Sequence, residues 1–232
     1  MSFPGAGTGL GWPRLHLRVT NSTNVRAREL AAGGAPHGTL VTASEQTAGR
    51  GRQGRTWSAP AGRALLCSLV IRRPRPLLSL AAGMAVATIA GDDARVKWPN
   101  DVLIGERKVA GILVEGRPQE DWGVLGIGLN VALAADDFPA ELRDRAGTLG
   151  LSVEEIEPTL ARLMAALGHW LERPDGEILA GFAHRDALRG RIVDWGQGRG
   201  RARGVDARGH LLVSTDDGRQ TALSAGEVHL VG

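Results

Sequence analysis

Short apolar segments separated by turn residues dominate the first 130 positions of the chain, and their patterns predict strands. Residues 15–19 (LHLRV) alternate between apolar and polar side chains, as a strand does. The segment 64–71 (ALLCSLVI) is apolar almost throughout, which is typical of a buried strand. Further strands are expected at residues 39–44, 95–98, 101–104, 108–116 and 122–132, with short turns between them.

Four longer segments have the composition and the end signals of helices. They lie within residues 21–34, 77–91, 152–171 and 176–188. The first begins with polar residues that can cap a helix and ends at two glycines, and the second has the Ala and Leu content of a buried helix. In the third, Ser152 and Glu155 form a capping-box pattern, and Pro158 indicates either a break or the start of the helix.

The pattern of apolar and turn residues changes at Arg189. Five short strand candidates follow, separated by Gly and Asp turns, and this spacing predicts a small all-β barrel of about 45 residues. We therefore expect an α+β protein with three parts. These are a flexible Gly/Pro-rich N-terminus (1–13), a mixed-sheet domain large enough to carry catalysis (14–188) and a C-terminal barrel (189–232).

The charge composition singles out two residues. The 232 residues include 28 Lys and Arg, but the only lysines are Lys97 and Lys108. The excess of arginine and the 33 glycines are typical of a GC-rich genome, and a net charge of +3 alone does not indicate nucleic-acid binding. Where arginine replaces lysine freely, the remaining lysines mark positions that need a compact ammonium group rather than a planar fork.

Composition also excludes several classes of protein. A single cysteine, Cys67, rules out a disulfide framework and a cysteine-based zinc cluster, and its apolar neighbours predict a core residue. There is no apolar run of about 18 residues and no secretion signal at the N-terminus. We expect a protein of the cytoplasm, with no membrane partner.

The sequence EQTAGRGRQGRTW (45–57) is the first candidate for chemistry. Glycines allow backbone amides to approach a ligand, and arginines provide forked donors for phosphate. A flexible basic surface loop is the alternative, but this segment lies between two predicted strands, where a long loop is usually functional. Trp57 at its end is either a core residue or a stacking partner for a purine.

The segment KWPNDVLIGERKVAGILVEG (97–116) contains both lysines. Asn100 and Asp101 follow Pro99 in a turn, where they are either ordinary turn formers or polar groups aimed at a ligand. Gly111 lies within the following apolar strand, at a point where a ligand or another backbone can come close.

Two further segments carry polar groups at the ends of elements. GVLGIGLNV (123–131) contains Gly126 and Gly128, but no helix follows, so the segment does not fit a dinucleotide-binding motif. Asn130 is a polar group at the end of the same strand. The NSTN sequence at the first helix start can bind a carboxylate, a carbonyl or a urea-like group, or can simply cap the helix.

Taken together and in this order, these motifs resemble the biotin protein ligases. The Q-x-x-G-R-G-R-x-G-R-x-W and K-W-P-N-D…K-x-A-G-I-L-x-E patterns are specific to that family, and the resemblance covers about residues 14–232. It implies a mixed-sheet catalytic domain of the biotin/lipoate ligase type and an SH3-like barrel. Some members carry an N-terminal DNA-binding domain. Because 13 residues precede the expected catalytic domain, we expect a ligase without that DNA-binding domain and without DNA as a partner.

The resemblance also implies an activity. ATP would activate biotin to biotinyl-5′-AMP, and the biotin would pass to a lysine of the biotin carboxyl carrier protein of acetyl-CoA carboxylase. Mg²⁺ would arrive with ATP, near Asp101, rather than in a fixed metal site. The protein would act as a monomer or a homodimer.

By the same resemblance, the residues divide into three overlapping groups. The biotin-binding group comprises Ser22, Thr23, Asn24, Gln46, Gly49, Arg50, Gly51, Arg52, Lys108, Gly111, Ile112 and Gly126. The ATP-binding group comprises Arg50, Arg52, Arg55, Trp57, Lys97, Asn100, Asp101, Lys108 and Asn130. The catalytic group is Lys108, Arg50, Arg52 and Asp101. Several members end the last strand with an arginine that reaches ATP. Here Val231 stands at that place, and Arg208 or Arg219 are the candidate replacements.

Two alternatives stay open at the level of sequence. A lipoate or octanoate ligase or transferase would share the fold but not the two motifs. A nucleic-acid-binding protein would use the GR-rich loop and the arginines at and within the barrel, which are Arg189, Arg191, Arg199, Arg201, Arg203 and Arg208.

Overall fold

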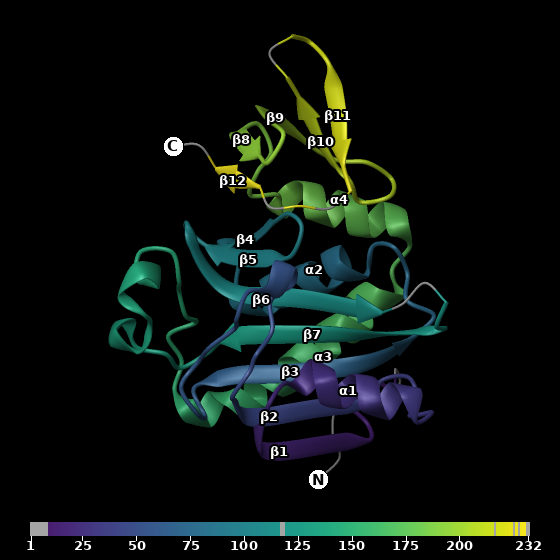
Figure 1. Ribbon diagram of the computed structural model, residues 1–232, viewed down its shortest axis with the longest axis vertical. Helices are drawn as coiled ribbons and strands as arrows, with labels where there is room; N and C mark the ends of the chain where they lie inside the picture. The colour runs from purple at the N-terminus through teal and green to yellow at the C-terminus, as the bar shows by residue number, and fades with distance from the viewer. Residues whose placement is uncertain (1–8, 117–118, 216, 225, 227, 231–232) are drawn as a thin grey trace.

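A seven-stranded mixed sheet organises the larger part of the molecule. The computed structural model describes residues 9–116, 119–215, 217–224, 226 and 228–230. The strand order is β1-β2-β3-β7-β6-β5-β4, and only the β1–β2 pair is parallel among these strands (Figure 1). The strands are β1 (Arg14–Thr20), β2 (Leu40–Gln46), β3 (Ala64–Arg72), β4 (Ala94–Lys97), β5 (Asp101–Ile104), β6 (Arg107–Gly116) and β7 (Trp122–Asn130).

Helices cover both faces of this sheet. They are α1 (Thr23–Ala32), α2 (Leu78–Ala90), α3 (Ile156–Glu172) and α4 (Asp175–Arg185). Ala27 and Ala31 of α1 pack on Val41, Val70 and Val124 on one face, while α2 and α3 pack on the other (Figure 1). The interior strand β3 is buried from Ala64 to Ile71, which explains its nearly continuous apolar sequence.

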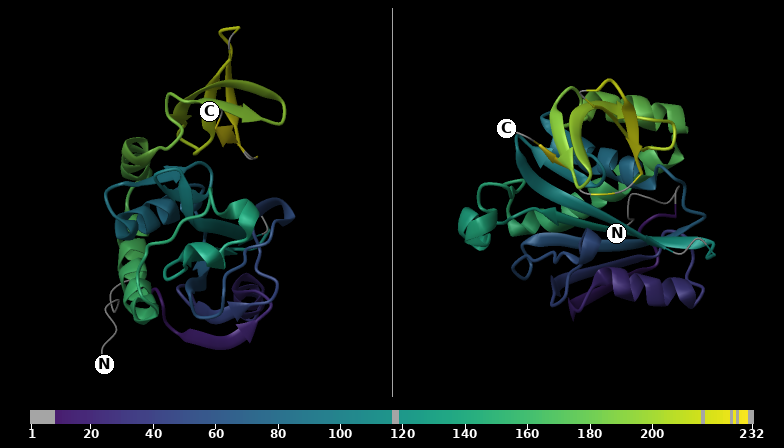
Figure 2. Two further views of the ribbon diagram at one scale, coloured as in Figure 1. Left: turned by 90° about the vertical axis from the view of Figure 1, so that its left-hand side faces the viewer. Right: turned by 45° about the horizontal axis from the view of Figure 1, so that its top comes forward.

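A second, antiparallel sheet of five strands follows α4. Its order is β11-β10-β9-β8-β12, and it lies beyond α4 and β4 in Figures 1 and 2. The strands are β8 (Ile192–Trp195), β9 (Gly198–Val205), β10 (Leu211–Ser214), β11 (Gln220–Leu223) and β12 (His229–Leu230). These elements confirm the expected α+β fold of a mixed sheet followed by a small β structure.

The second sheet is packed onto the first part of the chain through a shared core. Val193, Ala202 and Leu211 belong to the same buried cluster as α2 and α3. Trp98, buried in the turn between β4 and β5, donates its indole N–H to the carbonyl of Gly209 at 2.9 Å. The turn that carries the K-W-P-N-D motif is therefore anchored on the C-terminal sheet.

Two local expectations are wrong. The helix predicted after Ser152 begins at Ile156, after a short 3-10 turn (Val153–Glu155), and the Ser152 side chain does not cap it. Pro158 fits within the first helical turn because that turn needs no intrahelical amide donor. The prediction of a flexible N-terminus is also wrong for residues 10–13. Leu10 is buried in the core, and the Gly11 amide donates to the carbonyl of Gly38 at 2.9 Å. Residues 1–8 lie outside the described residues.

Within the described part of the chain, no helix has both the length and the apolarity that a membrane crossing requires.

Candidate active site

Nearly every residue that the motifs predicted lines one cavity of about 420 Å³. It lies between the start of α1, the loop after β2, strands β5 to β7 and the end of β12. Its lining includes all but one of the predicted residues, namely Ser22, Thr23, Asn24, Gln46, Arg50, Gly51, Arg52, Arg55, Trp57, Lys97, Asn100, Asp101, Lys108, Gly111, Ile112, Gly126 and Asn130.

Gly49 is the exception, and its role is structural. A Cβ atom there would lie 2.2 Å from the carbonyl oxygen of Trp57 and 2.9 Å from the Gln46 side chain. The Trp57 amide donates to the Gly49 carbonyl at 3.0 Å. The glycine therefore allows the two ends of the loop to approach each other.

One end of the cavity is neutral and rich in hydrogen-bonding groups. The amide and the hydroxyl of Thr23 both donate to Gln46 Oε1, at 2.7 and 3.0 Å. Ser22 is buried, and its side chain makes no capping hydrogen bond to α1. Capping of α1 therefore does not account for the polar residues at the start of this helix. Ser68, a buried serine in the apolar strand β3, also contacts this group, and only its polarity within that strand could have indicated it.

Glycines on β6 and β7 form a floor without side chains. A Cβ atom on Gly126 would lie 2.0 Å from Asn24 Oδ1, and one on Gly128 would lie 2.5 Å from the indole ring of Trp57. A Cβ atom on Gly111 would lie 3.1 Å from the same ring. These three positions need glycine because Asn24 and Trp57 approach the strands closely.

The other end of the cavity is charged. Lys108 Nζ lies 2.7 Å from Asp101 Oδ1 and 5.6 Å from the centroid of the Trp57 ring. Asp101 Oδ1 is buried, and among the described residues it accepts no well-aligned hydrogen bond, so its contact with Lys108 is mainly one of charge. Arg52 donates to Asn100 Oδ1 at 3.3 Å. A β-bulge beside Leu103 sets the register that brings the lysine to this side of the β5–β6 hairpin.

The GR-rich loop folds back on itself. Arg50 and Thr56 form an isolated antiparallel β-bridge, and the Gly51 amide donates to the carbonyl of Arg55 at 2.7 Å. The Arg50 guanidinium lies 3.4 Å from Glu115 of β6. Arg50, beside Glu115, and Arg52, beside Asn100, thus both line the cavity.

Known proteins share the sequence motifs and the fold of this chain. Two family models match the chain, the Biotin/lipoate A/B protein ligase family over residues 16–131 and the Biotin protein ligase C terminal domain over residues 188–231. The chain belongs to the biotin protein ligase family. The activity expected from the motifs, that of a biotin ligase, is therefore confirmed at the level of the family.

Individual relatives cover most of the ligase. It is 35% identical to the bifunctional ligase/repressor BirA of Bacillus spizizenii, with 93% of this chain and 74% of the relative covered. It is 33% identical to a biotin–[acetyl-CoA-carboxylase] ligase of Mycobacterium tuberculosis, with 96% and 91% covered. The biotin protein ligase from Aquifex aeolicus, solved in complex with biotin and ATP, superimposes with a TM-score of 0.75 at 29% identity, with 94% and 98% covered.

The tertiary structure adds residues to the candidate site that the motifs did not indicate. His229 and Leu230 of β12 line the cavity, as do Phe138, Leu142 and Arg145 from the segment after β7. Val231 lies outside the described residues. Neither candidate replacement for the family arginine lines the cavity, and the Arg219 guanidinium is paired with Asp217. Among the described residues of the C-terminal sheet, His229 lines the cavity with an imidazole side chain.

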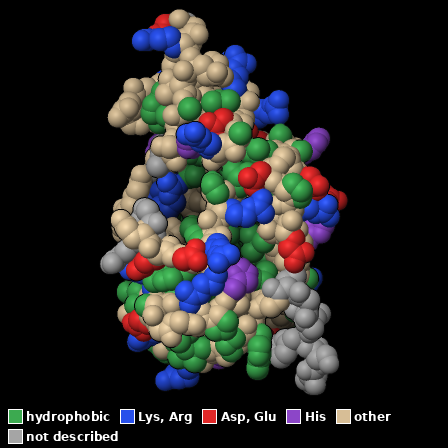
Figure 3. Space-filling view, turned by 90° about the vertical axis from the view of Figure 1, so that its right-hand side faces the viewer, with side chains coloured by type: hydrophobic (Ala, Val, Ile, Leu, Met, Phe, Trp, Pro, Cys, Tyr) green, Lys and Arg blue, Asp and Glu red, His purple; other side chains and the backbone are tan. Residues whose placement is uncertain are grey.

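The arginines of the C-terminal sheet do not form an uninterrupted basic surface. Arg199 lies 3.7 Å from Asp194, Arg201 donates to the carbonyl of Gly190, and Arg203 donates to Ser214. On the face drawn in Figure 3, acidic side chains are interspersed among the basic ones. This surface of the ligase differs from the single-sign stripe that nucleic-acid binding favours.

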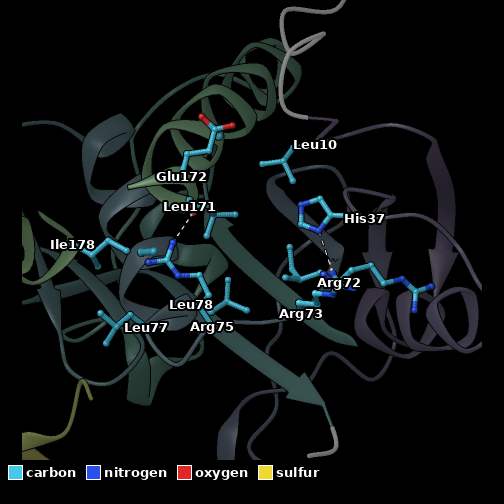
Figure 4. A pocket seen from close by; sticks show the side chains of 13 residues that line it. Leu10, His37, Arg72, Arg73, Arg75, Leu77, Leu78, Leu171, Glu172 and Ile178 are labelled. Carbon is cyan, nitrogen blue, oxygen red and sulfur yellow. Dashed lines mark hydrogen bonds between the residues drawn. The ribbon is translucent and has the colours of Figure 1, made fainter. Parts of the chain in front are cut away.

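A second cavity of about 230 Å³ lies on the opposite side of the sheet, between α2 and α3 (Figure 4). Its floor is apolar, and its arginines are already engaged. Arg72 donates to the carbonyls of Ala31 and Ala35, and Arg75 donates to the carbonyl of Leu171. The residues that the motifs predicted are therefore concentrated in the larger cavity.

Cys67 of the ligase is a core residue, as its apolar neighbours predicted. Burial raises the pKa of its thiol to about 12, although the charge of Arg14 acts in the opposite direction.

We expect thiol reagents at pH 8 to label Cys67 in the unfolded chain but not in the folded protein. Because an unfolded thiol ionises near pH 9 and the folded one does not, the free energy of unfolding should fall between pH 9 and 12, relative to Cys67→Ala. Equal labelling rates for folded and unfolded protein would contradict the burial.

Proposed function

We propose that this ligase uses ATP to convert biotin to biotinyl-5′-AMP and then transfers biotin to a lysine of a biotin carboxyl carrier protein, that of acetyl-CoA carboxylase. One observation carries the proposal: a single cavity joins a neutral hydrogen-bonding end at Thr23 and Gln46 to a cationic end at Lys108 and Arg52. Biotin has the matching shape, a neutral ureido ring at one end and a carboxylate at the other. The Aquifex aeolicus relative, solved with biotin and ATP, supports the same pair of substrates.

The first step joins two anions, so the site must compensate negative charge. The biotin carboxylate attacks the α-phosphorus of ATP, and pyrophosphate leaves. Lys108 would leave Asp101 and contact the reacting oxygens, where its compact ammonium group stabilises the charge of the transition state. Arg50 and Arg52, from a loop with a glycine between them, can follow the phosphates with forked hydrogen bonds. Trp57, Lys97, Asn100 and Asn130 would surround the nucleotide.

The residues at the charged end fit a nucleotide-borne Mg²⁺. Mg²⁺ is usually held by one or two carboxylates together with substrate phosphates, and the buried oxygen Asp101 Oδ1 is a suitable ligand. Within the described residues no cluster of three or more His, Cys, Asp or Glu side chains forms a complete metal site. When bound, Mg²⁺ would offset phosphate charge.

The second step needs access for a lysine side chain and protection from water. The carrier amine attacks the mixed anhydride, AMP leaves, and no protein nucleophile is required. The 49–56 loop would cover the anhydride before the carrier arrives, since its glycines permit the backbone change. That the loop orders over the adenylate stays a prediction.

Calorimetry of biotin binding, with and without a non-hydrolysable ATP analogue, tests the proposed substrates. Pyrophosphate release and transfer of labelled biotin to an isolated carrier domain then test the two steps. We expect biotin to bind and lipoate and duplex DNA not to bind. Tight lipoate binding with no biotin binding would favour the lipoate class, and salt-sensitive DNA binding without biotin binding would favour the nucleic-acid class.

Arg52→Gly should weaken closure of the loop over the adenylate. The substitution removes the hydrogen bond from Arg52 to Asn100 and the charge that would hold the phosphate. We expect weaker biotin binding and release of biotinyl-5′-AMP, which then labels lysines of unrelated proteins. The measurement is streptavidin detection of albumin after incubation with ATP and biotin, with the exposed Arg208→Gly as control. Unlabelled albumin together with normal carrier labelling would contradict the role of the loop.

A further inference from the structure

The polar residues at the neutral end of the cavity form one connected chain that ends at Glu115. Ser68 Oγ lies 2.8 Å from Thr23 Oγ1 and 2.6 Å from Asn24 Oδ1, and Thr23 Oγ1 donates to Gln46 Oε1 at 3.0 Å. Asn24 Nδ2 donates to Glu115 Oε2 at 2.8 Å. Glu115 ends the K-x-A-G-I-L-x-E motif, but the resemblance assigned it no role toward biotin or ATP.

This chain has fewer protons than contacts. The hydroxyl groups of Ser68 and Thr23 contribute two protons, whereas three oxygen-to-oxygen contacts link Gln46, Thr23, Ser68 and Asn24. A half-turn of the Asn24 amide would place Nδ2 against Ser68 and provide the missing proton. The hydroxyl cluster by itself therefore favours an Asn24 that donates rather than accepts.

Glu115 opposes that half-turn. An ionised carboxylate can only accept hydrogen bonds, so Asn24 must keep Nδ2 toward it and Oδ1 over Gly126, at the cavity wall. The carbonyl of Leu113, at 3.4 Å from Nδ2, is a weaker second acceptor. We propose that Glu115 is a positioning residue that fixes Asn24 as an acceptor for a ureido N–H of biotin. The inference rests on the proposed function, since it takes biotin as the ligand.

Two arginines lie beside the Glu115 carboxylate. Its side chain is 19% exposed, and two guanidiniums compensate it, Arg50 at 3.4 Å and Arg28 at 3.9 Å. A neutral side chain at this position would leave these arginines without their carboxylate partner. The same carboxylate thus joins Asn24 to the first arginine of the loop.

Glu115→Gln tests the inference because glutamine has the same shape and can either donate or accept. The substrates are biotin and its two carbamate analogues, in which a ring oxygen replaces one or the other ureido N–H. One of the two analogues places its ring oxygen against Asn24, and in the wild type Asn24 Oδ1 would repel that oxygen. For this analogue we expect kcat/KM for adenylate formation to be on the order of 100-fold lower than for biotin. In Glu115→Gln, Asn24 can turn and donate to the ring oxygen. The discrimination should then fall about tenfold, whereas a merely structural role would lower all three rates alike and leave their ratio unchanged.

Two further variants control the experiment. Glu115→Asp keeps a carboxylate and should restore most of the discrimination, and it serves as the main test if Glu115→Gln does not fold. Glu29→Gln removes a surface carboxylate that pairs with Arg26 and should change nothing. An unchanged ratio in a folded Glu115→Gln protein, with normal adenylation of biotin by the wild type, overturns this inference alone. A wild type that forms no biotinyl-5′-AMP overturns the proposed function, and this inference with it.

Discussion

Lys108→Ala should reduce the rate of biotinyl-5′-AMP formation by about 100-fold or more. The ammonium group is the charge that lies against Asp101 at the cationic end of the cavity, and loss of one such electrostatic contact typically costs on the order of 3 kcal/mol in the transition state. Lys108→Arg should lose less but not recover fully. The lysine stem lies against Gly111, where a Cβ atom would be 3.3 Å from Cε, and a planar fork cannot take the same position.

The measurement for Lys108 is biotin-dependent pyrophosphate release under single-turnover conditions, at a temperature where each variant is folded. Arg107→Ala, an exposed neighbour on the same strand, is the matched control and should retain the wild-type rate. Because Lys108→Ala leaves Asp101 without its cation, a small decrease in melting temperature is expected as well. Full activity of Lys108→Arg would show that a positive charge of any shape is sufficient there.

Gly126→Ala should weaken biotin binding by about 100-fold while the protein still folds. The added Cβ atom would lie 2.0 Å from Asn24 Oδ1, and β7 cannot move away because it is hydrogen-bonded to β3 on one side and β6 on the other. Asn24 must therefore leave its position, with a stability cost of about 1–3 kcal/mol for overpacking. Calorimetric titration with biotin measures the loss.

A double-mutant cycle identifies the cause of the Gly126 effect. In an Asn24→Ala background the clash is gone, so Gly126→Ala should add little to the loss of affinity. Gly123→Ala, on the same strand, meets its nearest atoms at 3.4 Å and is the matched control. Equal effects of Gly126→Ala in both backgrounds would show that the glycine acts through something other than Asn24.

The elements of the fold were largely predictable from local pattern. Alternation, continuous apolar runs and Gly or Pro punctuation located the strands from β1 to β7, because each signal depends on side chains close together in sequence. The start of α3 and the packing of Leu10 were not predictable in this way. The first depends on how Val153–Glu155 turn, and the second on an apolar site formed by elements far along the chain.

The candidate site was likewise predictable in part from the sequence. The sequence by itself determined the family and the residues of the two motifs, because the GR-rich loop and the K-W-P-N-D segment keep their spacing in the chain. Only the tertiary structure decided that Ser68 and His229 belong with them, and that Glu115, the last residue of the second motif, contacts Asn24. Asn24 and Glu115 are 91 positions apart, and they meet because β3 pairs with β7 and β7 with β6 beneath α1. That strand order is set by how the apolar faces of the whole sheet are buried, which short-range sequence patterns do not encode.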